Sequence, residues 1–562
     1  MKKLALSMLC ISSSFAYAGN DDLDMANKIR AEGFYNSEVM HTLEQLTDTI
    51  GPRLSGSPQM KKANDWTLEK LKGWGLEKAH LDPFEFGRGW SHDSATINLL
   101  SPREVSLHGI PVAWTPGTSG EVTGDVVIFD ASSEADLAQY KGKLKGKIIM
   151  MGQGKNIEAP ENSVFKRYDS GELSKLKDFD VSKGPSHSPW ISAERRDSAM
   201  QRYNFRQTLN TFLKEEKVAG VVYRSWRQGG LINVFGRDHR VGKTFPVPAI
   251  IIEAEHYNLM ARMIDNGKTP KLALNIEARF HDEDRNAYNT IAEITGSDEN
   301  PEIVMVGGHL DSWHASDGAV DNGAGVAVSM EAMRILKALD FKPKRTIRIG
   351  LWSGEEQGLF GSASYVEENF ATRPKPTDKN ERALPNYLWK NQGWPIETKA
   401  DHEKFSVYFN MDNGSGRFRG IYTEGNVAAK SVFSNWFSPY SDLSTGTITN
   451  KSTGGTDHES FDDVGLPGFQ FIQDKLDYGS RLHHTHIDSI DHVVEDDLKQ
   501  ASVIMAGFLY KAAMAEERMP RKPMPQEISS LQKKKLALKS EKARKKREKD
   551  GNKAKAINAV QN

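Results

Sequence analysis

The sequence predicts an α/β fold with a mainly parallel sheet, to which a separate β-rich unit is attached. Apolar strands and amphipathic helices alternate from Asn289 to about Met514, and this alternation is typical of parallel sheets. Residues 101–284 instead hold short apolar runs separated by Gly and Pro. The chain has 562 residues, more than one hydrophobic core supports, so we expect at least two domains.

The first part of the α/β domain is expected in residues 19–100, as helices that lead into a strand. Apolar side chains recur at helical spacing from Met60 to Leu71, after the turn Gly56-Ser57-Pro58. Within the β-rich unit, strands are predicted at 125–129, 147–151, 220–223 and 249–252. The polar stretch 152–204 interrupts this unit and carries no clear pattern.

The second part of the α/β domain covers residues 285–520. Strands are predicted there at 303–306, 346–352, 405–409 and 468–472, with helices over 324–339 and near 356–370. The last region, 521–562, is rich in Lys and has few large apolar residues, which predicts a tail that does not pack.

Residues 1–18 have the features of a signal peptide. Met1-Lys2-Lys3 is basic, Leu4 to Ile11 is apolar, and Ala16-Tyr17-Ala18 offers small residues at a cleavage site. We therefore expect export, to the periplasm or the medium. Cys10 is the only cysteine, which excludes a disulfide scaffold, a cysteine zinc site and a cysteine nucleophile. No stretch approaches the roughly 18 apolar residues of a membrane span.

The net charge of −1 combines an acidic body with a basic C-terminal region. Residues 19–520 hold 58 Lys and Arg against 71 Asp and Glu, whereas residues 521–562 hold 14 against 4. An exported acidic body is not expected to bind nucleic acid. The basic tail could make a weak contact with an anionic surface. The sequence leaves a homodimer open.

Side chains that can hold a metal follow each of the four predicted strands of residues 285–520. Because the carboxyl ends of parallel strands meet at one edge of the sheet, we expect these side chains to lie together. They are His309, Asp311 and Asp321 after the first strand, Glu355 and Glu356 after the second, Asp412 after the third, and His483, His484, His486 and Asp488 after the fourth.

Imidazoles and carboxylates without a thiolate suit zinc. One catalytic zinc needs only three protein ligands, so five or more favour a pair of ions that share a bridging carboxylate. Glu355 and Glu356 could then divide the tasks of general base and ligand. Asp311 and Asp488 each lie close in sequence to a histidine, and we expect both to orient the imidazoles. A single such residue is usually a turn former, but four strand ends in succession favour a metal site.

Several motifs resemble the co-catalytic zinc exopeptidases, a family of aminopeptidases and carboxypeptidases. They are IGPRLSGS at 50–57, NTIAEITGS at 289–297, GHLDSW at 308–313, LWSGEEQG at 351–358, GTD at 455–457 and HHTHIDS at 483–489. The resemblance runs from about residue 35 to 515. It implies an aminopeptidase-like catalytic domain with an inserted protease-associated domain at 101–284, which includes Phe245–Ala249.

The resemblance also implies a role for each site residue, and two Zn²⁺ as cofactors. One zinc would be held by His309 and Asp412, the other by Glu356 and His484, with Asp321 bridging them, Glu355 as general base and Asp311 beside it. His484 is preferred to His483 and His486 because the family places this ligand four residues before an Asp, here Asp488. A cis peptide is implied after Asp321.

The function expected from these residues is a zinc-dependent exopeptidase that cleaves terminal peptide bonds or dipeptides. A non-catalytic binding ectodomain on the same fold and a single-zinc glutaminyl cyclase are the alternatives. The end of the peptide that is recognised stays open. A free carboxylate would need an arginine or a backbone anion site, and Arg417, Arg419 and Arg481 are candidates. Segments 152–204 and 371–404, with the tail, depart from the family pattern.

Overall fold

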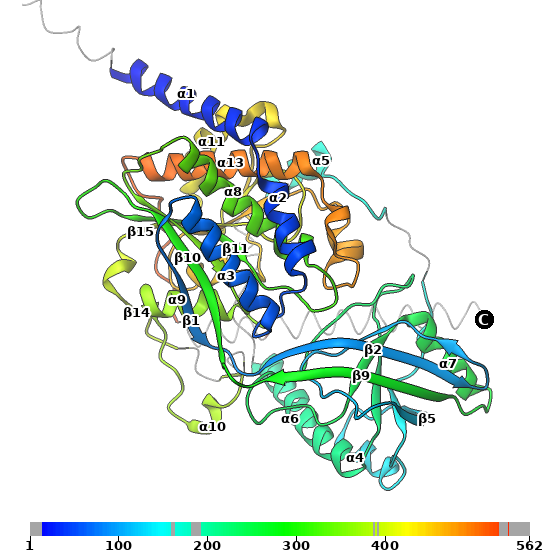
Figure 1. The fold of residues 1–562 in the computed structure, drawn as a ribbon. Coiled ribbons are helices and arrows are strands. Elements are labelled where there is room, and N and C mark those ends of the chain that lie inside the picture. Colours follow the sequence, from blue (N-terminus) through cyan, green and yellow to red (C-terminus); the bar gives the residue numbers. More distant parts are fainter. Residues whose placement is uncertain are drawn as a thin grey trace, which may run out of the picture.

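The computed structural model describes residues 14–158, 163–180, 193–385, 388–389, 393–527 and 538. These residues form two units, each built on an eight-stranded sheet (Figure 1). The chain passes from the larger unit into the smaller one between β1 and β2 and returns between β9 and β10. The predicted mixed α/β fold is therefore confirmed.

The larger unit carries a sheet with the strand order β1-β10-β12-β11-β15-β18-β16-β17. Its four central strands, β12, β11, β15 and β18, pair in parallel, so their carboxyl ends share one edge. The strands are β1 (Glu77–Glu85), β10 (Asn286–Ile294), β11 (Ile303–His309), β12 (Thr346–Trp352), β15 (Phe405–Asn410), β16 (Phe418–Tyr422), β17 (Thr447–Thr449) and β18 (Gly468–Gln473).

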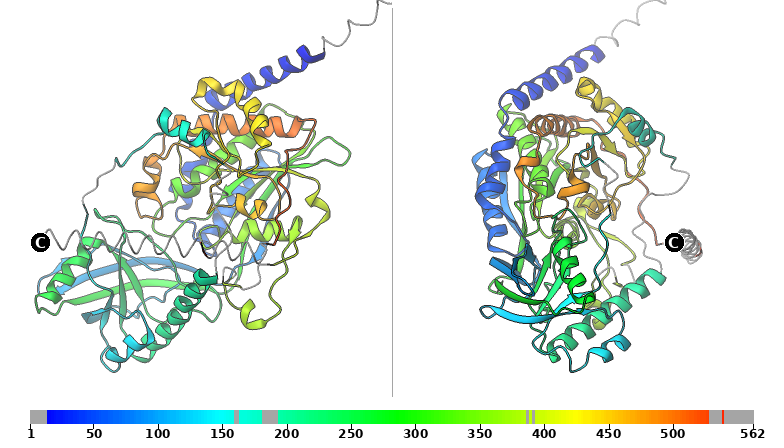
Figure 2. Two further views of the ribbon diagram at one scale, coloured as in Figure 1. Left: turned by 180° about the vertical axis from the view of Figure 1, so that it is seen from behind. Right: turned by 90° about the vertical axis from the view of Figure 1, so that its right-hand side faces the viewer.

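Helices cover both faces of this sheet, because its central strands are apolar on both sides. One face carries α2 (Val39–Glu44), α3 (Pro58–Gly73), α8 (Ala324–Ala338), α11 (Ala429–Phe437) and α13 (Glu495–Met514). The other carries α9 (Phe360–Asn369) and α12 (His458–Asp462), whose side chains pack with Trp352 and Phe405. The helix α1 (Ser14–Tyr35) packs on α13 at the end of the larger unit that is distant from the smaller unit (Figures 1 and 2).

The smaller unit carries a sheet with the order β3-β2-β9-β5-β6-β7-β8-β4. Its strands are β2 (Gly89–Ser101), β3 (Val105–Ser106), β4 (Gly109–Pro111), β5 (Val122–Phe129), β6 (Ile148–Met151), β7 (Gly220–Arg224), β8 (Ala249–Ile252) and β9 (Lys271–His281). Two apolar clusters lie on its faces, and α4 (Glu134–Leu137), α6 (Ala193–Glu215) and α7 (Ala254–Asp265) complete it.

The two segments that depart from the family pattern have structure where they are described. Segment 152–204 contains α5 (Ser170–Lys177), which packs against β17, and the start of α6. Segment 371–404 contains β13 (Ala371–Thr372), α10 (Lys379–Arg382) and β14 (Glu397–Thr398).

The helix predicted near 356–370 begins only at Phe360. Gly354 and Gly358 have φ of 73° and 132°, outside the helical range, and Leu359 has φ 60°. A turn therefore separates β12 from the helix, and it carries both glutamates of the motif.

Both ends of the chain extend beyond the described residues. Of the predicted signal peptide, residues 1–13 lie outside them, and of the predicted tail only 521–527 and 538 are described. Arg521 donates hydrogen bonds to the carbonyl oxygens of His402 and Phe405, at 2.6 and 2.7 Å, so the first tail residues contact the larger unit. No helix within the described ranges is both long enough and apolar enough to cross a membrane.

Candidate metal centre and active site

Three buried side chains meet at the carboxyl end of β11. His309 is the last residue of that strand, and its Nε2 lies 3.5 Å from Asp321 Oδ1 and 3.5 Å from Asp412 Oδ1. One ligand atom from each of the three lies within 4.8 Å of the others. This is a spacing that one metal ion can span.

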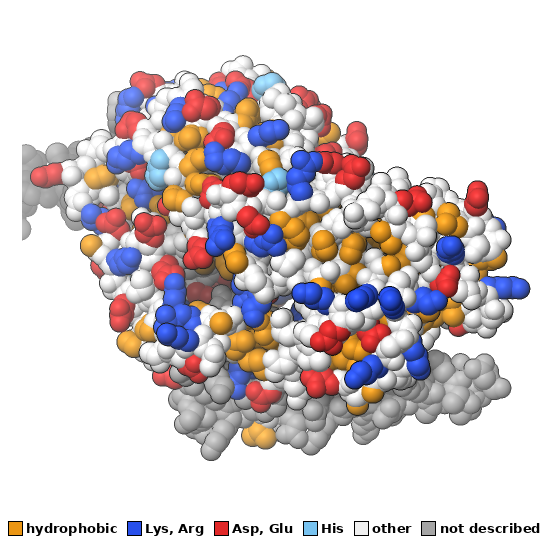
Figure 3. Space-filling model, turned by 60° about the horizontal axis from the view of Figure 1, so that its bottom comes forward, with side chains coloured by type: hydrophobic (Ala, Val, Ile, Leu, Met, Phe, Trp, Pro, Cys, Tyr) orange, Lys and Arg blue, Asp and Glu red, His pale blue; other side chains and the backbone are white. Residues whose placement is uncertain are grey.

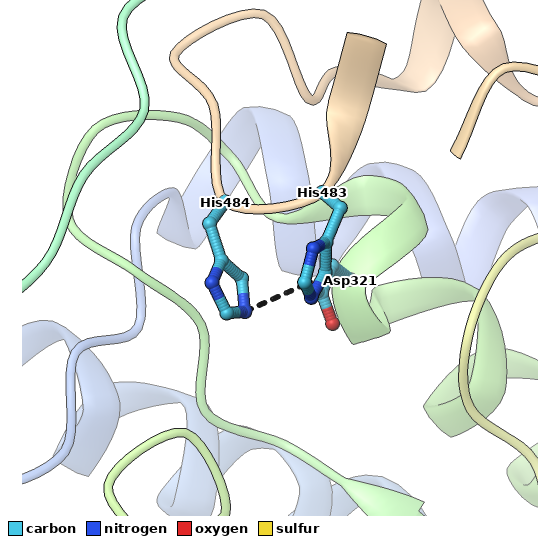
Figure 4. Close-up of side chains that lie close together, drawn as sticks. All are labelled: Asp321, His483 and His484. Carbon is cyan, nitrogen blue, oxygen red and sulfur yellow. Dashed lines mark ion pairs between the residues drawn. The ribbon is translucent and has the colours of Figure 1, made fainter. Parts of the chain in front are cut away.

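A second group shares Asp321 with the first. Asp321, His483 and His484 also bring ligand atoms within 4.8 Å of one another (Figure 4). His484 Nε2 lies 3.6 Å from Asp321 Oδ2 and 2.9 Å from Glu356 Oε2. The ring of His483 lies beside that of His484, with centroids 3.7 Å apart. Asp321 thus stands between the two groups.

Asp311 connects His309 to the turn that carries the glutamates. Its carboxylate accepts hydrogen bonds from the backbone N–H of Glu355 at 3.3 Å and of Glu356 at 3.4 Å, and from Ser55 Oγ at 3.0 Å. His309 Nδ1 lies 2.9 Å from the carbonyl oxygen of Asp311 and 3.5 Å from its Oδ1. These contacts direct His309 Nε2 toward Asp321 and Asp412.

Among the described residues, Asp488 makes no hydrogen bond or ion pair with an imidazole, which corrects the expectation for this residue. Its two carboxylate oxygens accept hydrogen bonds from the N–H groups of Val320 and Asp321, at 2.8 and 2.9 Å. Asp488 therefore fixes the backbone that carries Asp321, in a segment that includes a cis peptide between Asp321 and Asn322. Burial and the neighbouring Asp321 raise the pKa of Asp488 to about 7.

The cluster has more buried carboxylates than buried cations. Burial raises the pKa of Glu355 and of Glu356 well above the usual value, and neighbouring carboxylates, Asp412 for Glu355 and Asp321 for Glu356, raise it further. For Asp321, the neighbouring imidazoles of His309 and His484 outweigh burial and lower the pKa to about 2. Buried charges of one sign are costly unless cations compensate them.

Three buried polar atoms of the predicted ligands have no hydrogen-bond partner among the described residues. They are His309 Nε2, Asp321 Oδ2 and Glu356 Oε1. All three are donor atoms of the kind that zinc prefers, and they face the two groups just described. The residues present therefore fit a pair of divalent cations.

Sequence reasoning assigned no role to Asp457, although its GTD motif was noted. Asp457 is fully buried, and burial raises its pKa to about 7, with Asp412 and Asp311 among the nearby charges. It is the residue directly before α12. The GTD motif resembles the family, but the sequence alone does not show that its aspartate lies beside the candidate metal ligands.

The smaller unit holds the loop that carries His484. The N–H of Val234 donates to the carbonyl oxygen of His484 at 2.8 Å, and the N–H of His486 donates to that of Ile232 at 3.1 Å. Arg227 Nη1 donates to the carbonyl oxygen of Gly479 at 2.9 Å. The candidate site is therefore completed by backbone contacts from the second unit.

Two of the three arginines considered for binding a free carboxylate of the substrate already form ion pairs with buried carboxylates. Arg417 pairs with the buried Asp497 at 3.0 Å, and Arg419 pairs with the buried Asp474 at 3.1 Å. Arg481 belongs to the turn that precedes His483. Arg417 and Arg419 therefore serve the packing of the larger unit.

This fold and this cluster define a metallopeptidase, a hydrolase of peptide bonds. Residues 289–509 match the model of peptidase family M28, and this range includes every predicted site residue. The chain also resembles carboxypeptidase Q of Rattus norvegicus, with 26% identity over 495 residues that cover 87% of this chain and 88% of that protein.

Two solved structures share the fold. A peptidase M28 precursor from Shewanella amazonensis SB2B has a TM-score of 0.62 at 24% identity, covering 90% of this chain and all of that one. BSAP, a zinc aminopeptidase from Bacillus subtilis, has a TM-score of 0.54 at 18% identity, covering 86% of this chain and 96% of that one.

Proposed function

We propose that the protein is an exported exopeptidase that uses two zinc ions. His309 and Asp412 would hold one ion, Glu356 and His484 the other, and Asp321 would bridge them. The observation that carries the proposal is the pair of ligand groups that share Asp321. The imidazole and carboxylate donors favour zinc, and the zinc aminopeptidase of similar fold supports this choice.

The positions of the side chains support a division of labour among the site residues. When bound, the zinc ions supply a Lewis acid that polarises the peptide carbonyl and lowers the pKa of water. Glu355 has no ligand role in this scheme, and its Oε2 lies 3.9 Å from His309 Nε2. We assign it the acceptance of a proton from the attacking water and its delivery to the leaving amine. Asp311 holds the backbone of Glu355 in place for this step.

The substrate is proposed to be a peptide or dipeptide cleaved at a terminal bond. The similarity to carboxypeptidase Q over most of both chains supports a carboxypeptidase or dipeptidase, while the aminopeptidase of similar fold keeps the other end open. The smaller unit is proposed as the inserted protease-associated domain. Export rests on the features of residues 1–18.

The two alternative functions, a non-catalytic binding ectodomain and a single-zinc glutaminyl cyclase, are less well supported. A non-catalytic ectodomain would not need the full set of five ligands together with Glu355. A single-zinc cyclase would not need two ligand groups around Asp321.

Metal analysis and one pair of variants test the proposal. The purified protein should hold about two zinc ions per chain and lose peptide hydrolysis on chelation. Glu355→Gln should keep both ions and lower kcat by about 10²- to 10⁴-fold, because an amide cannot transfer the proton. Asp321→Asn is the matched contrast and should lose zinc. An active preparation with one ion per chain, or Glu355→Gln with normal kcat, would contradict the mechanism.

A further inference from the structure

A cavity of about 1050 Å³ lies between the two units, next to the catalytic turn. The smaller unit lines it with α6 and the segment that contains Arg237 to Phe245. The larger unit contributes Gln357 and Gly358, which directly follow Glu356, and part of α9. Figure 3 shows this side of the molecule, where Lys and Arg side chains border the hollowed region.

Arg237 brings a positive charge to this cavity without an acidic partner. Its Nε is buried and makes no hydrogen bond with the described residues, and its Nη2 donates to the hydroxyl of Tyr223. The guanidinium carbon lies 4.8 Å from the ring centre of Tyr223 and 4.7 Å from that of Phe245. In the described part of the chain, no carboxylate forms an ion pair with it. Burial, with a smaller effect from Arg206, lowers the pKa of Arg237 to about 10, so it stays charged at neutral pH.

Two other cations of the cavity, Arg240 and Lys375, are compensated by carboxylates. Arg240 makes hydrogen bonds to both carboxylate oxygens of Asp238, at 2.9 and 2.6 Å. Lys375 pairs with Glu367 at 2.9 Å. Arg240 therefore offers a matched arginine that lines the same cavity but already has a carboxylate partner, unlike Arg237.

Gln357 supplies a second, independent sign of a missing polar partner. Both its Nε2 and its Oε1 are buried, and neither makes a hydrogen bond within the described ranges. A buried amide without partners costs stability, which a ligand can recover. Gln357 Nε2 and Arg237 Nε are both donors, and they line the same cavity from opposite units. Two donors, one of them charged, suit a carboxylate.

We propose that this cavity binds a carboxylate of the peptide substrate, and that Arg237 and Gln357 determine this specificity. The inference rests on the proposed exopeptidase function and adds the substrate class to it. The carboxylate is either the free C-terminus of the peptide or an Asp or Glu side chain. Gln357 follows the proposed zinc ligand Glu356 directly, so one wall of the cavity belongs to the catalytic turn.

Arg237→Gln tests the proposal, with Arg240→Gln as the matched control. We would measure kcat and KM on the peptides Ala-Glu, Ala-Gln and Ala-Gln-amide. Arg237→Gln should raise KM about 10- to 100-fold for the peptides whose carboxylate is recognised, with little change in kcat. A loss on both Ala-Glu and Ala-Gln identifies the C-terminus, and a loss on Ala-Glu alone identifies the side chain. Arg240→Gln should leave all three peptides unchanged.

Two further measurements separate misfolding and failure of the proposed function from failure of this inference. Thermal denaturation reports whether Arg237→Gln folds, and Gln357→Leu probes the same cavity from the other unit. Calorimetric binding of Ala-Glu to the zinc-loaded Glu355→Gln protein should weaken by the same factor when Arg237→Gln is added. If the unmodified enzyme cleaves no peptide, the proposed function fails. If it cleaves them and Arg237→Gln affects Ala-Glu and Ala-Gln-amide equally, the carboxylate site is refuted.

Discussion

Replacement of Arg53 by Met should destabilise the larger unit more than any surface substitution. Arg53 is fully buried and donates five hydrogen bonds to backbone carbonyl oxygens, at 2.6 to 3.2 Å. The acceptors are Leu46, Gly51, Leu310, Asp317 and Gly318, which belong to three separate segments. One of these segments leads directly into Asp321.

The magnitude follows from these bonds. A typical hydrogen bond contributes about 1 kcal/mol, and a buried acceptor left without a donor costs a similar amount or more. Three of the five bonds share Nη1, which weakens each of them. We therefore expect Arg53→Met to lower the free energy of unfolding by about 4 kcal/mol, close to the upper end of single substitutions.

Urea denaturation followed by near-UV circular dichroism measures this change. Arg30→Met is the control, because Arg30 pairs with Asp442 at the surface and such pairs contribute about 0 to 1 kcal/mol. Arg53→Met should also reduce zinc content, since the segment before Asp321 loses its support. If Arg53→Met and Arg30→Met were equally stable, the five carbonyl contacts would not have the importance assigned to them.

Two predictions concern pH and the C-terminal residues. Burial lowers the pKa of His314 to about 3. The unfolded chain therefore binds this proton more readily than the folded chain does. The free energy of unfolding should fall by up to about 1.4 kcal/mol per pH unit as the pH decreases from 6.5 toward 3. His314→Gln should flatten that dependence in denaturation series at several pH values, and an unchanged slope would refute the assignment. A chain that ends after Glu527 should keep its thermal midpoint, whereas one that ends after Pro520 should lose several degrees, because Arg521 and Lys522 then no longer contact the larger unit. Equal midpoints for the two truncated chains would show that these contacts contribute nothing.

The fold was predictable where burial leaves a simple pattern. The strand predicted at 346–352 coincides with β12, because strands covered on both faces are continuous apolar runs. The helix after it was predicted too early, because the turn from Ser353 to Leu359 depends on Asp311, a residue 44 positions away from Glu355. Local periodicity contains no information on such a contact.

The candidate site was predictable only in its charged residues. His309, Asp321, Asp412, Glu356 and His484 follow strand ends, and the structure brings them together. The support from the smaller unit could not be predicted, since Ile232 and Val234 act through backbone groups that every residue has. The role of Arg237 could not be predicted for a related reason, because its lack of an acidic partner is a property of the folded chain.

Because residues 232–234 pair through their backbone with residues 484–486, catalytic activity reports whether the two units have docked. The loop of His484 gains these backbone contacts only when the surfaces of the two units meet. Recovery of peptide hydrolysis should therefore lag behind the recovery of secondary structure. Cleavage of the smaller unit by a protease near Val234 should abolish peptide hydrolysis, although every candidate metal ligand stays in the chain.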